Sequence, residues 1–209
     1  NPHMHMFEAT TALFAVTGKT RFRDMAEECL GLFRDAFLTK DGRVLEYFAE
    51  DWTPLDEREQ VIEPGHMAEW VYLIDCYELA TGRSAQVPME IFYREVLARR
   101  DKAGLLPDRS DPAADTRRMW PQTELLKASI SMARRGEEPA NSPSPEEILE
   151  LIWEQYLDTP VDGGWYDKRS TEGALLSDNM PASTFYHILV AFRFYLSDGA
   201  SAHSRISSS

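Results

Sequence analysis

Apolar residues recur at three- and four-residue steps in seven segments of the chain, which is the spacing of an α-helix with a buried face. The first segment, about 4–16, stops just before Gly18, and the third, about 66–80, stops just before Gly82. Glycine commonly follows the last turn of a helix, so these stops support the prediction. The other predicted helices cover about 21–37, 89–100, 121–134, 145–157 and 184–196.

The first, third, fifth and seventh of these helices are apolar on nearly all sides, whereas the others carry one apolar stripe and many charged residues. Helices that are apolar all round lie in an interior, and striped helices cover it. Repeated hairpins of this kind predict an all-α fold, an α/α toroid, with residues 1–200 in one domain. Seven helices do not close such a ring, so we expect absent sequence or a partner chain to cover its open face.

Four segments are predicted to be non-helical. The partial alternation of residues 42–48 suggests a short strand, and residues 163–166 and 173–176 suggest a small strand pair. Residues 201–209, which are rich in serine, are expected to form a disordered tail.

The chain has 209 residues, enough for one domain with a sizeable core. Its 35 acidic and 22 basic side chains give a net charge of −13, which argues against nucleic-acid binding and favours a neutral ligand or a locally compensated anion. Cys29 and Cys76 lie in apolar helical stretches, which predicts buried, reduced thiols and a cytoplasmic location. The longest apolar run, about 185–196, is broken by two polar residues and is too short to span a membrane.

Three of the five histidines stand near the start of a predicted helix. His5, His66 and His187 each follow a turn signal or a run of small residues, and the segment from Trp120 to Glu124 opens a fourth helix in the same way. These starts recur roughly every 60 residues, as expected for a repeat architecture. Equivalent ends of repeated helices therefore carry polar, titratable side chains, and we expect them to meet at one site.

Two of these histidines are followed three positions later by a glutamate, Glu69 after His66 and Glu8 after His5. Side chains at that spacing share one helix face, so each carboxylate can orient its imidazole. A helix start disfavours the imidazolium form, whereas the nearby carboxylate favours it. These opposed effects can leave the imidazole pKa near the operating pH, as proton transfer requires. The alternative for His66 is a helix cap beside an incidental glutamate.

His187 lies in an apolar helix, where a histidine is more often a satisfied core residue, but its place near the start of an inner helix favours a cavity wall. His3 and His5 flank Met4, so they point to different sides of the helix start, and His3 is predicted to be a cap or an exposed residue. No metal is expected, because the chain has neither a His-x-x-x-His pair nor a Cys/His cluster. A zinc site assembled from distant positions is the weaker alternative.

Trp52, Trp120 and Trp165 fall in predicted loops or at helix starts. Aromatic rings beside carboxylates suit a sugar, whose C–H faces stack while its hydroxyls need acceptors. Gln122 and Glu124 are expected to contact those hydroxyls, and packing at the rim is the alternative for the tryptophans.

Four fragments, in the expected order, resemble the N-acylglucosamine 2-epimerase superfamily, and within it the branch labelled mannose isomerase or mannose-6-phosphate isomerase-like. They span nearly the whole chain. The resemblance implies the C-terminal seven helices of an (α/α)6 barrel and a cofactor-free 1,2-isomerisation or 2-epimerisation of a sugar. An arginine that the family supplies from its N-terminal part has no counterpart here. The fragments are Asn1-Pro2-His3-Met4-His5, Glu63-Pro64-Gly65-His66-Met67-Ala68-Glu69-Trp70, Arg118-Met119-Trp120-Pro121-Gln122-Thr123-Glu124 and Tyr186-His187.

The same resemblance implies roles for the matched residues. His66 and His187 match the histidines that exchange protons with the open-chain sugar. His5 matches a histidine in ring opening or substrate binding, and Glu69 matches the glutamate three residues after the second histidine. The matched tryptophan and carboxylate contacts are Trp120 and Glu124.

The predicted function is an aldose–ketose isomerase of the mannose/fructose type, acting through a cis-enediol intermediate. His187 is the predicted base at C2 and His66 its acid/base partner, with the reverse assignment open. A sugar 2-epimerase is the nearest alternative, and an inactive toroid fragment or sugar-binding scaffold is the alternative of another class. A glycoside hydrolase or lyase is less favoured, because histidines rather than a carboxylate pair stand at the repeated helix starts. A free sugar is favoured over a phosphorylated one, because the sequence has no phosphate loop.

Overall fold

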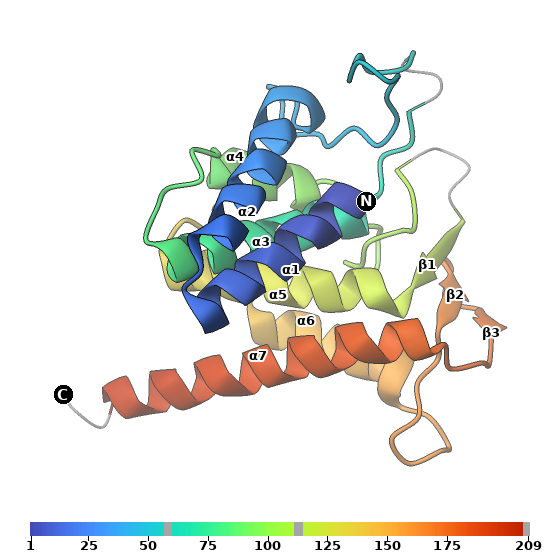
Figure 1. The fold of residues 1–209 in the computed structure, drawn as a ribbon. Helices are drawn as coiled ribbons and strands as arrows, with labels where there is room; N and C mark the ends of the chain where they lie inside the picture. The colour runs from blue at the N-terminus through green and yellow to red at the C-terminus, as the bar shows by residue number, and fades with distance from the viewer. Residues whose placement is uncertain (57–59, 111–114, 207–209) are drawn as a thin grey trace.

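The computed structural model describes residues 1–56, 60–110 and 115–206, with side chains as far as residue 197. Within these residues, seven α-helices and three short strands follow one another along the chain (Figure 1). All seven predicted helices are confirmed. Their bounds are α1 (Pro2–Thr17), α2 (Thr20–Leu32), α3 (Pro64–Thr81), α4 (Met89–Leu97), α5 (Met119–Arg135), α6 (Pro145–Ile152) and α7 (Ala182–Ile206), and α2 and α6 run on into π-helical turns, η1 (Phe33–Phe37) and η2 (Trp153–Leu157).

The helices form two layers. Helix α3 packs against α1 and α5, and α5 packs against α7, so the odd-numbered helices lie side by side (Figure 1). Each of α2, α4 and α6 packs on the helix that precedes it. The predicted inner and outer layers, and the predicted toroidal fold class, are therefore confirmed.

The helix ends follow from local chemistry. Pro2 and Pro64 stand in the first turns of α1 and α3, where the missing N–H costs no helical hydrogen bond. Gly18, Gly82 and Gly136 end α1, α3 and α5 in the left-handed region, with φ of 64°, 67° and 66°. These caps end the three helices after 16, 18 and 17 residues.

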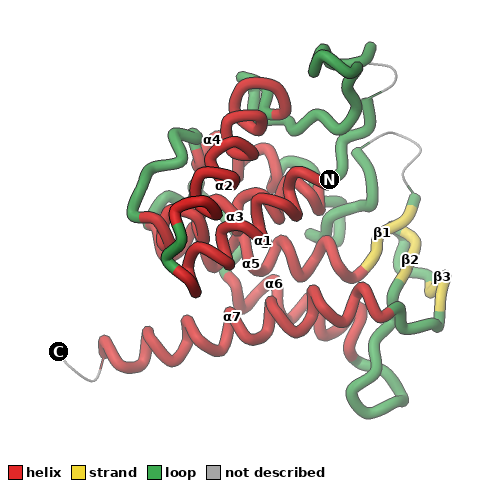
Figure 2. The backbone as a smooth tube through the Cα atoms, in the orientation of Figure 1, coloured by secondary structure: helices red, strands yellow, loops and turns green. Residues whose placement is uncertain are grey.

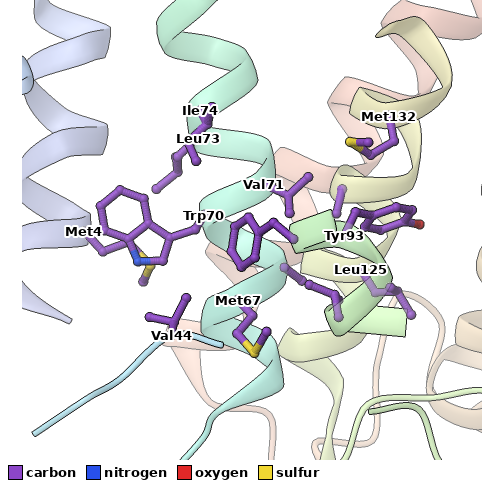
Figure 3. Close-up of a cluster of buried hydrophobic side chains, with 14 of the residues drawn as sticks. Met4, Val44, Met67, Trp70, Val71, Leu73, Ile74, Tyr93, Leu125 and Met132 are labelled. Carbon is purple, nitrogen blue, oxygen red and sulfur yellow. The ribbon is translucent and has the colours of Figure 1, made fainter. Parts of the chain in front are cut away.

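The core is built around aromatic side chains between α1, α2 and α3. Trp70 of α3 points toward Met4 of α1 (Figure 3). The Trp70 ring stacks on Phe33 at 4.1 Å between centroids and lies 5.3 Å from Phe7. Phe7 and Phe33 are fully buried and Trp70 is 3% exposed, so this cluster removes three large apolar surfaces from water.

The three strands form one small antiparallel sheet in the order β1 (Thr116–Arg118), β2 (Lys168–Ser170) and β3 (Leu175–Ser177). Strand β3 overlaps the predicted segment 173–176, but its partner is residues 168–170 rather than 163–166. The reason is that Gly164 closes a tight turn by donating its N–H to the carbonyl of Val161. Strand β1 was not predicted, because three residues are too few for an alternating pattern.

The predicted strand at 42–48 is wrong. That stretch makes only isolated bridges, at Val44 and Phe48, and runs as an irregular loop (Figure 2). The side-chain amide of Gln60 replaces a partner strand, since its oxygen accepts from the backbone N–H of Tyr47 and its nitrogen donates to the Tyr47 carbonyl.

Helix α7 is longer than predicted. It continues to Ile206, through residues assigned to a disordered tail, while residues 207–209 lie outside the described part. The physical reason is that an established helix gains one hydrogen bond for each residue added, whereas only the first turn is costly. Among the described helices, none is both long and apolar enough to cross a membrane.

Candidate active site

One cavity of about 310 Å³ opens at the shared end of the inner helices. The N-terminal ends of α1, α5 and α7 lie on the same side of the molecule, near the small sheet (Figure 1). The predicted convergence of His5, His66 and His187 in one hollow is confirmed. The lining of this histidine cavity is Asn1, His5, His66, Glu69, Arg118, Trp120, Asp167, Pro181, Ser183, Thr184 and His187.

His66 is held by residues that precede it in the chain. Its Nδ1 lies 3.0 Å from Glu46 Oε1 and 3.6 Å from Glu63 Oε2, and its Nε2 lies 2.9 Å from the side-chain nitrogen of Asn1. Because the Asn1 amide donates, Nε2 is the bare nitrogen and Nδ1 carries the hydrogen. The prediction that Glu69 orients His66 is therefore wrong. Side chains in a helix lean toward its N-terminus, which turns His66 toward the segments before α3.

His187 is held by a carboxylate that is itself paired with a cation. Its Nδ1 lies 2.6 Å from Glu124 Oε1, and Glu124 Oε2 lies 2.7 Å from Lys127 Nζ. Glu124 and Lys127 are completely buried. Glu124 was expected to contact sugar hydroxyls, but both its oxygens are engaged behind the histidine. With Nδ1 occupied, Nε2 is the ring nitrogen of His187 available to a ligand.

The starts of α5 and α7 are joined, which fixes the backbone near His187. Thr184 Oγ1 donates to Asp167 Oδ1 at 2.7 Å, and the backbone carbonyl of Asp167 accepts from the N–H of Met119 at 2.9 Å. Thr184 and Asp167 are both largely buried. The two helices that supply Glu124 and His187 are therefore linked at the cavity wall.

Trp120 lies against both central histidines. Its ring centroid lies 5.4 Å from that of His66 and 5.3 Å from that of His187, with interplanar angles of 38° and 37°. The indole therefore contacts both imidazoles. This placement is consistent with the predicted contact between Trp120 and a ligand.

We expect Gly65→Ala to displace Trp120, because an added Cβ would lie 2.5 Å from Trp120 Cη2 and 3.0 Å from Pro121 Cβ. Overpacking of this kind costs about 1–3 kcal/mol, so the free energy of unfolding should fall by about that amount. Thermal unfolding measures this loss. Gly31→Ala in α2 is the matched control, since nothing lies within 4 Å of its added Cβ. Equal behaviour of the two variants would contradict the packing argument.

His5 and Glu8 form the predicted pair, with 3.2 Å between His5 Nδ1 and Glu8 Oε2. The Tyr186 hydroxyl of α7 donates to the other Glu8 oxygen. Burial opposes ionisation of Glu8, but hydrogen bonds from His5 and Tyr186 outweigh it and lower the pKa of this carboxyl below its usual value. Glu8 is therefore a carboxylate, and it connects α1 to α7 beside the cavity.

Glu69 differs from the other two acids. Burial, followed by repulsion from Glu124, raises the pKa of Glu69 to about 9. Its side chain is 1% exposed, Oε1 has no hydrogen-bond partner, and the nearest His5 nitrogen is 3.9 Å away. Glu69 is therefore a neutral carboxylic acid at pH 7, able to donate a hydrogen bond into the cavity.

The raised pKa of Glu69 predicts a pH-dependent effect of Glu69→Gln. Between pH 4.5 and about 9, the folded protein holds a proton that the unfolded chain has lost, so this group makes stability fall as pH rises. Glutamine has no such proton, so the stability of the variant relative to wild type should increase from pH 5 to pH 8.5. Thermal unfolding at both pH values, with the exposed Glu28→Gln as control, measures this. A difference independent of pH would show that Glu69 is ionised in the fold.

Two predicted binding residues do not reach the histidine cavity. Trp52 lies in a separate hollow of about 480 Å³, where its ring meets His3 edge-on at 5.0 Å. His3 is thus half-buried against an aromatic ring rather than exposed. Gln122 is fully buried, and its amide bonds to the backbone N–H and carbonyl of Leu106, both at 2.8 Å. Gln122 therefore has a structural role at the start of α5.

Sequence reasoning missed several residues at this site. Glu63 and Arg118 belong to the quoted motifs, so their position beside key residues was a usable signal. Lys127 was marked by a charge three residues after Glu124 in an apolar helix. Glu46 gave no signal, because it comes from an irregular loop with no periodicity. Asn1 gave none either, since a residue ahead of a helix has no repeat partner.

Two groups of side chains could approach a cation. The ligand atoms of His5, Glu8 and Glu69 lie within 4.8 Å of one another, and so do those of Glu69, Glu124 and His187. Glu69 carries a proton at neutral pH, and Glu124 already has the ammonium of Lys127 beside it. The expectation of a metal-free site stays a prediction.

The family model for N-acylglucosamine 2-epimerase (GlcNAc 2-epimerase) matches residues 1–191 of the chain. A mannose-6-phosphate isomerase of Rhizobium meliloti (strain 1021) is 34% identical over 207 residues, which cover 91% of this chain and 53% of that protein. The chain thus spans about half the length of this curated relative.

Solved structures give the same picture of the fold. A D-mannose isomerase matches with a TM-score of 0.79 and 21% identity, over 95% of this chain and 54% of that one. The cellobiose 2-epimerase of Spirochaeta thermophila matches with a TM-score of 0.72 and 22% identity, over 96% of this chain and 52% of that one. Identities this low compare the fold alone, and here they support the (α/α)6-barrel architecture.

Proposed function

The chain belongs to the N-acylglucosamine 2-epimerase family, and from this premise we propose that it is part of a sugar aldose–ketose isomerase of the mannose/fructose type. The observation that carries the proposal is the pair of oriented imidazoles, His66 and His187, which line one cavity and both contact Trp120. The printed names of the relatives include both isomerases and 2-epimerases.

The chemistry begins with the open-chain sugar in the cavity. His187 Nε2 removes the proton from C2, and the electron pair of that C–H bond forms the C1–C2 double bond while the carbonyl oxygen at C1 becomes an enediolate oxygen. The neutral acid Glu69 gives its proton to this oxygen, which becomes the C1 hydroxyl of a cis-enediol. The imidazolium of His187 then returns its proton at C1, while the bare Nε2 of His66 takes the proton of the C2 hydroxyl, whose oxygen becomes the ketone. This proton returns to Glu69 before the next turnover. His5 is proposed to assist ring opening or sugar binding.

The second imidazole in the cavity also favours one alternative. If His66 is first protonated at Nε2 and delivers that proton to C2 from the face opposite His187, the product is the C2 epimer instead of the ketose. Product analysis with mannose separates the two outcomes in the whole protein. Fructose supports the isomerase, and glucose alone would replace it with a 2-epimerase.

We propose a free sugar as substrate. Among the residues that line the histidine cavity, Arg118 carries the permanent positive charge. Its Nε is 3.3 Å from Asp108 Oδ1, so this charge is partly compensated. A phosphate group usually needs several donors or cations. Comparing kcat/KM for mannose and mannose 6-phosphate tests this, and a large preference for the phosphate would contradict it.

We propose that further barrel sequence or a partner chain covers the open edges formed by α1 and α7. Val16 is 87% exposed, and on α7 Leu189 and Leu196 are 56% and 68% exposed, which is unusual for large apolar side chains. The match to half of a longer relative supports this. If isothermal titration of the whole protein showed sugar binding without turnover, a sugar-binding scaffold would replace the enzyme.

A further inference from the structure

A buried lysine stands directly behind the proposed base. Lys127 is completely buried on α5, one helical turn beyond Glu124. Its Nζ lies 2.7 Å from Glu124 Oε2 and 4.3 Å from the centre of the Tyr72 ring. A fully buried lysine is rare, because removing an ammonium from water is costly unless a paired charge compensates it.

The lysine stands among three acids but pairs with one of them. Glu8 receives hydrogen bonds from His5 and Tyr186, and Glu69 holds its own proton at neutral pH. Glu124 has Lys127 on one oxygen and His187 Nδ1 on the other. The ammonium thus neutralises the one carboxylate that touches the proposed base.

We propose that Lys127 is a positioning residue for the isomerisation: by holding Glu124 as a carboxylate, it keeps the hydrogen of His187 on Nδ1 and leaves Nε2 bare toward the sugar. The proposal rests on the proposed role of His187 as the base. Lys127 itself lies behind Glu124 and is not part of the cavity lining.

The other charged groups around His187 do not replace this function. Glu69 of α3 is within reach of the ring but neutral, and Glu8 of α1 is engaged by Tyr186. Tyr72 presents its ring to Lys127. Across the cavity stand His66, Arg118 and Asp167, of which Arg118 pairs with Asp108 and Asp167 accepts from Thr184.

Removing the ammonium leaves a buried negative charge beside an imidazole. Because an uncompensated buried charge is costly, the Glu124–His187 pair should take up one proton near neutral pH. The proton either makes His187 an imidazolium or neutralises Glu124, which then donates to Nδ1. In both cases Nε2 carries a hydrogen, and the base is lost.

The direct test is the ring-nitrogen NMR signal of His187 in the whole protein without sugar. The nitrogen chemical shifts of protonated and bare ring nitrogens are well separated. The signal of His187 is the one that is missing from the spectrum of His187→Gln. At pH 7 we expect a bare Nε2 in wild type and a protonated Nε2 in Lys127→Met. A protonated Nε2 in wild type, or a bare Nε2 in a folded Lys127→Met, would overturn the proposal. Lys102→Met, at an exposed lysine, is the matched control and should resemble wild type.

A double variant keeps the proposal testable if Lys127→Met folds poorly. In Glu124→Gln/Lys127→Met both charges are absent, and the amide oxygen can still accept from Nδ1, so Nε2 should be bare again. If lysine acted only by filling space, the double variant would be no closer to wild type than Lys127→Met. Non-additive behaviour of this kind identifies a direct interaction.

The kinetic readout is the pH profile. For Lys127→Met, the acid limb of kcat should move up by about one to three pH units, because the base loses its proton only at higher pH. A lower kcat with an unmoved profile would indicate a structural role and overturn the proposal. The NMR signal is read without sugar, so it tests the role of Lys127 even if the protein proves not to be an isomerase.

Discussion

Replacing His187 by glutamine in the whole protein is expected to lower kcat for sugar isomerisation by about 10²–10⁴-fold, the range that a positioned general base supplies. Glutamine can still meet Glu124 through its amide N–H groups, but it cannot accept the C2 proton. KM should change little, because Trp120 and the other cavity walls stay in place. Steady-state kinetics with mannose measure both constants.

The chain offers a matched control for this loss. His3 also meets a tryptophan ring, at 5.0 Å from Trp52, but lies in the separate hollow outside the histidine cavity. His3→Gln should therefore retain kcat within a few fold. An equal loss in both variants would mean that histidine removal disturbs the fold rather than the reaction.

The largest expected effect on stability comes from Phe33→Ala. Phe33 is fully buried where α2 passes into η1, and it contacts both Trp70 and Phe92. Phenylalanine-to-alanine changes in a core cost about 3–5 kcal/mol, through the lost transfer energy and the cavity left behind. That is a large part of the total stability of an ordinary domain, so the free energy of unfolding by urea should fall clearly.

Met25→Ala on the same helix is the control for this change. Met25 is 41% exposed, so its truncation removes little buried surface. Its effect should stay within about 0.5 kcal/mol of wild type. If Phe33→Ala proved equally mild, α2 and η1 would not be packed on α3 as described.

The helical repeat could be predicted from sequence because each helix is long and periodic. The run from Pro121 to Met132 is buried at every position, although it includes Gln122, Glu124 and Lys127. Its apolar positions predicted an inner helix, but the burial of these polar side chains could not be predicted from periodicity. The strands were less predictable, because three-residue strands carry no period. The loop at 42–48 looked like a strand, yet Gln60 supplies its hydrogen bonds from a distant position.

The convergence of the histidines was also predictable, because equivalent ends of repeated helices meet at one end of a toroid. Their hydrogen-bond partners were harder to assign. Helical spacing favoured Glu69 for His66, but the imidazole bonds Glu46 from an irregular loop, twenty positions earlier. Gln122 and Glu124 lie in the matched motif, yet their side chains point to the backbone of Leu106 and to His187. The spacing of two residues along a helix shows whether their side chains share a face. Their hydrogen-bond partners depend on which other segments pack against that face.

Glu69 and Glu124 show how the environment assigns different tasks to the same residue type. Both are buried at the cavity, but Glu124 has the ammonium of Lys127 at 2.7 Å, whereas one oxygen of Glu69 has no partner. One acid is therefore a carboxylate bonded to an imidazole, and the other is a neutral acid that can donate a hydrogen bond. Pairs of groups with separated pKa values are a common basis for acid–base assignments at active sites.

The most direct test of the central claim is the reaction of the whole protein with mannose in D2O, followed by NMR of the product. If His187 carries the proton between C2 and C1 and exchanges it with solvent, fructose should contain deuterium at C1, and the label should disappear together with turnover in His187→Gln. Fructose formed at a normal rate without any solvent deuterium, or undiminished labelling in His187→Gln, would contradict the proposal that this imidazole moves the substrate proton.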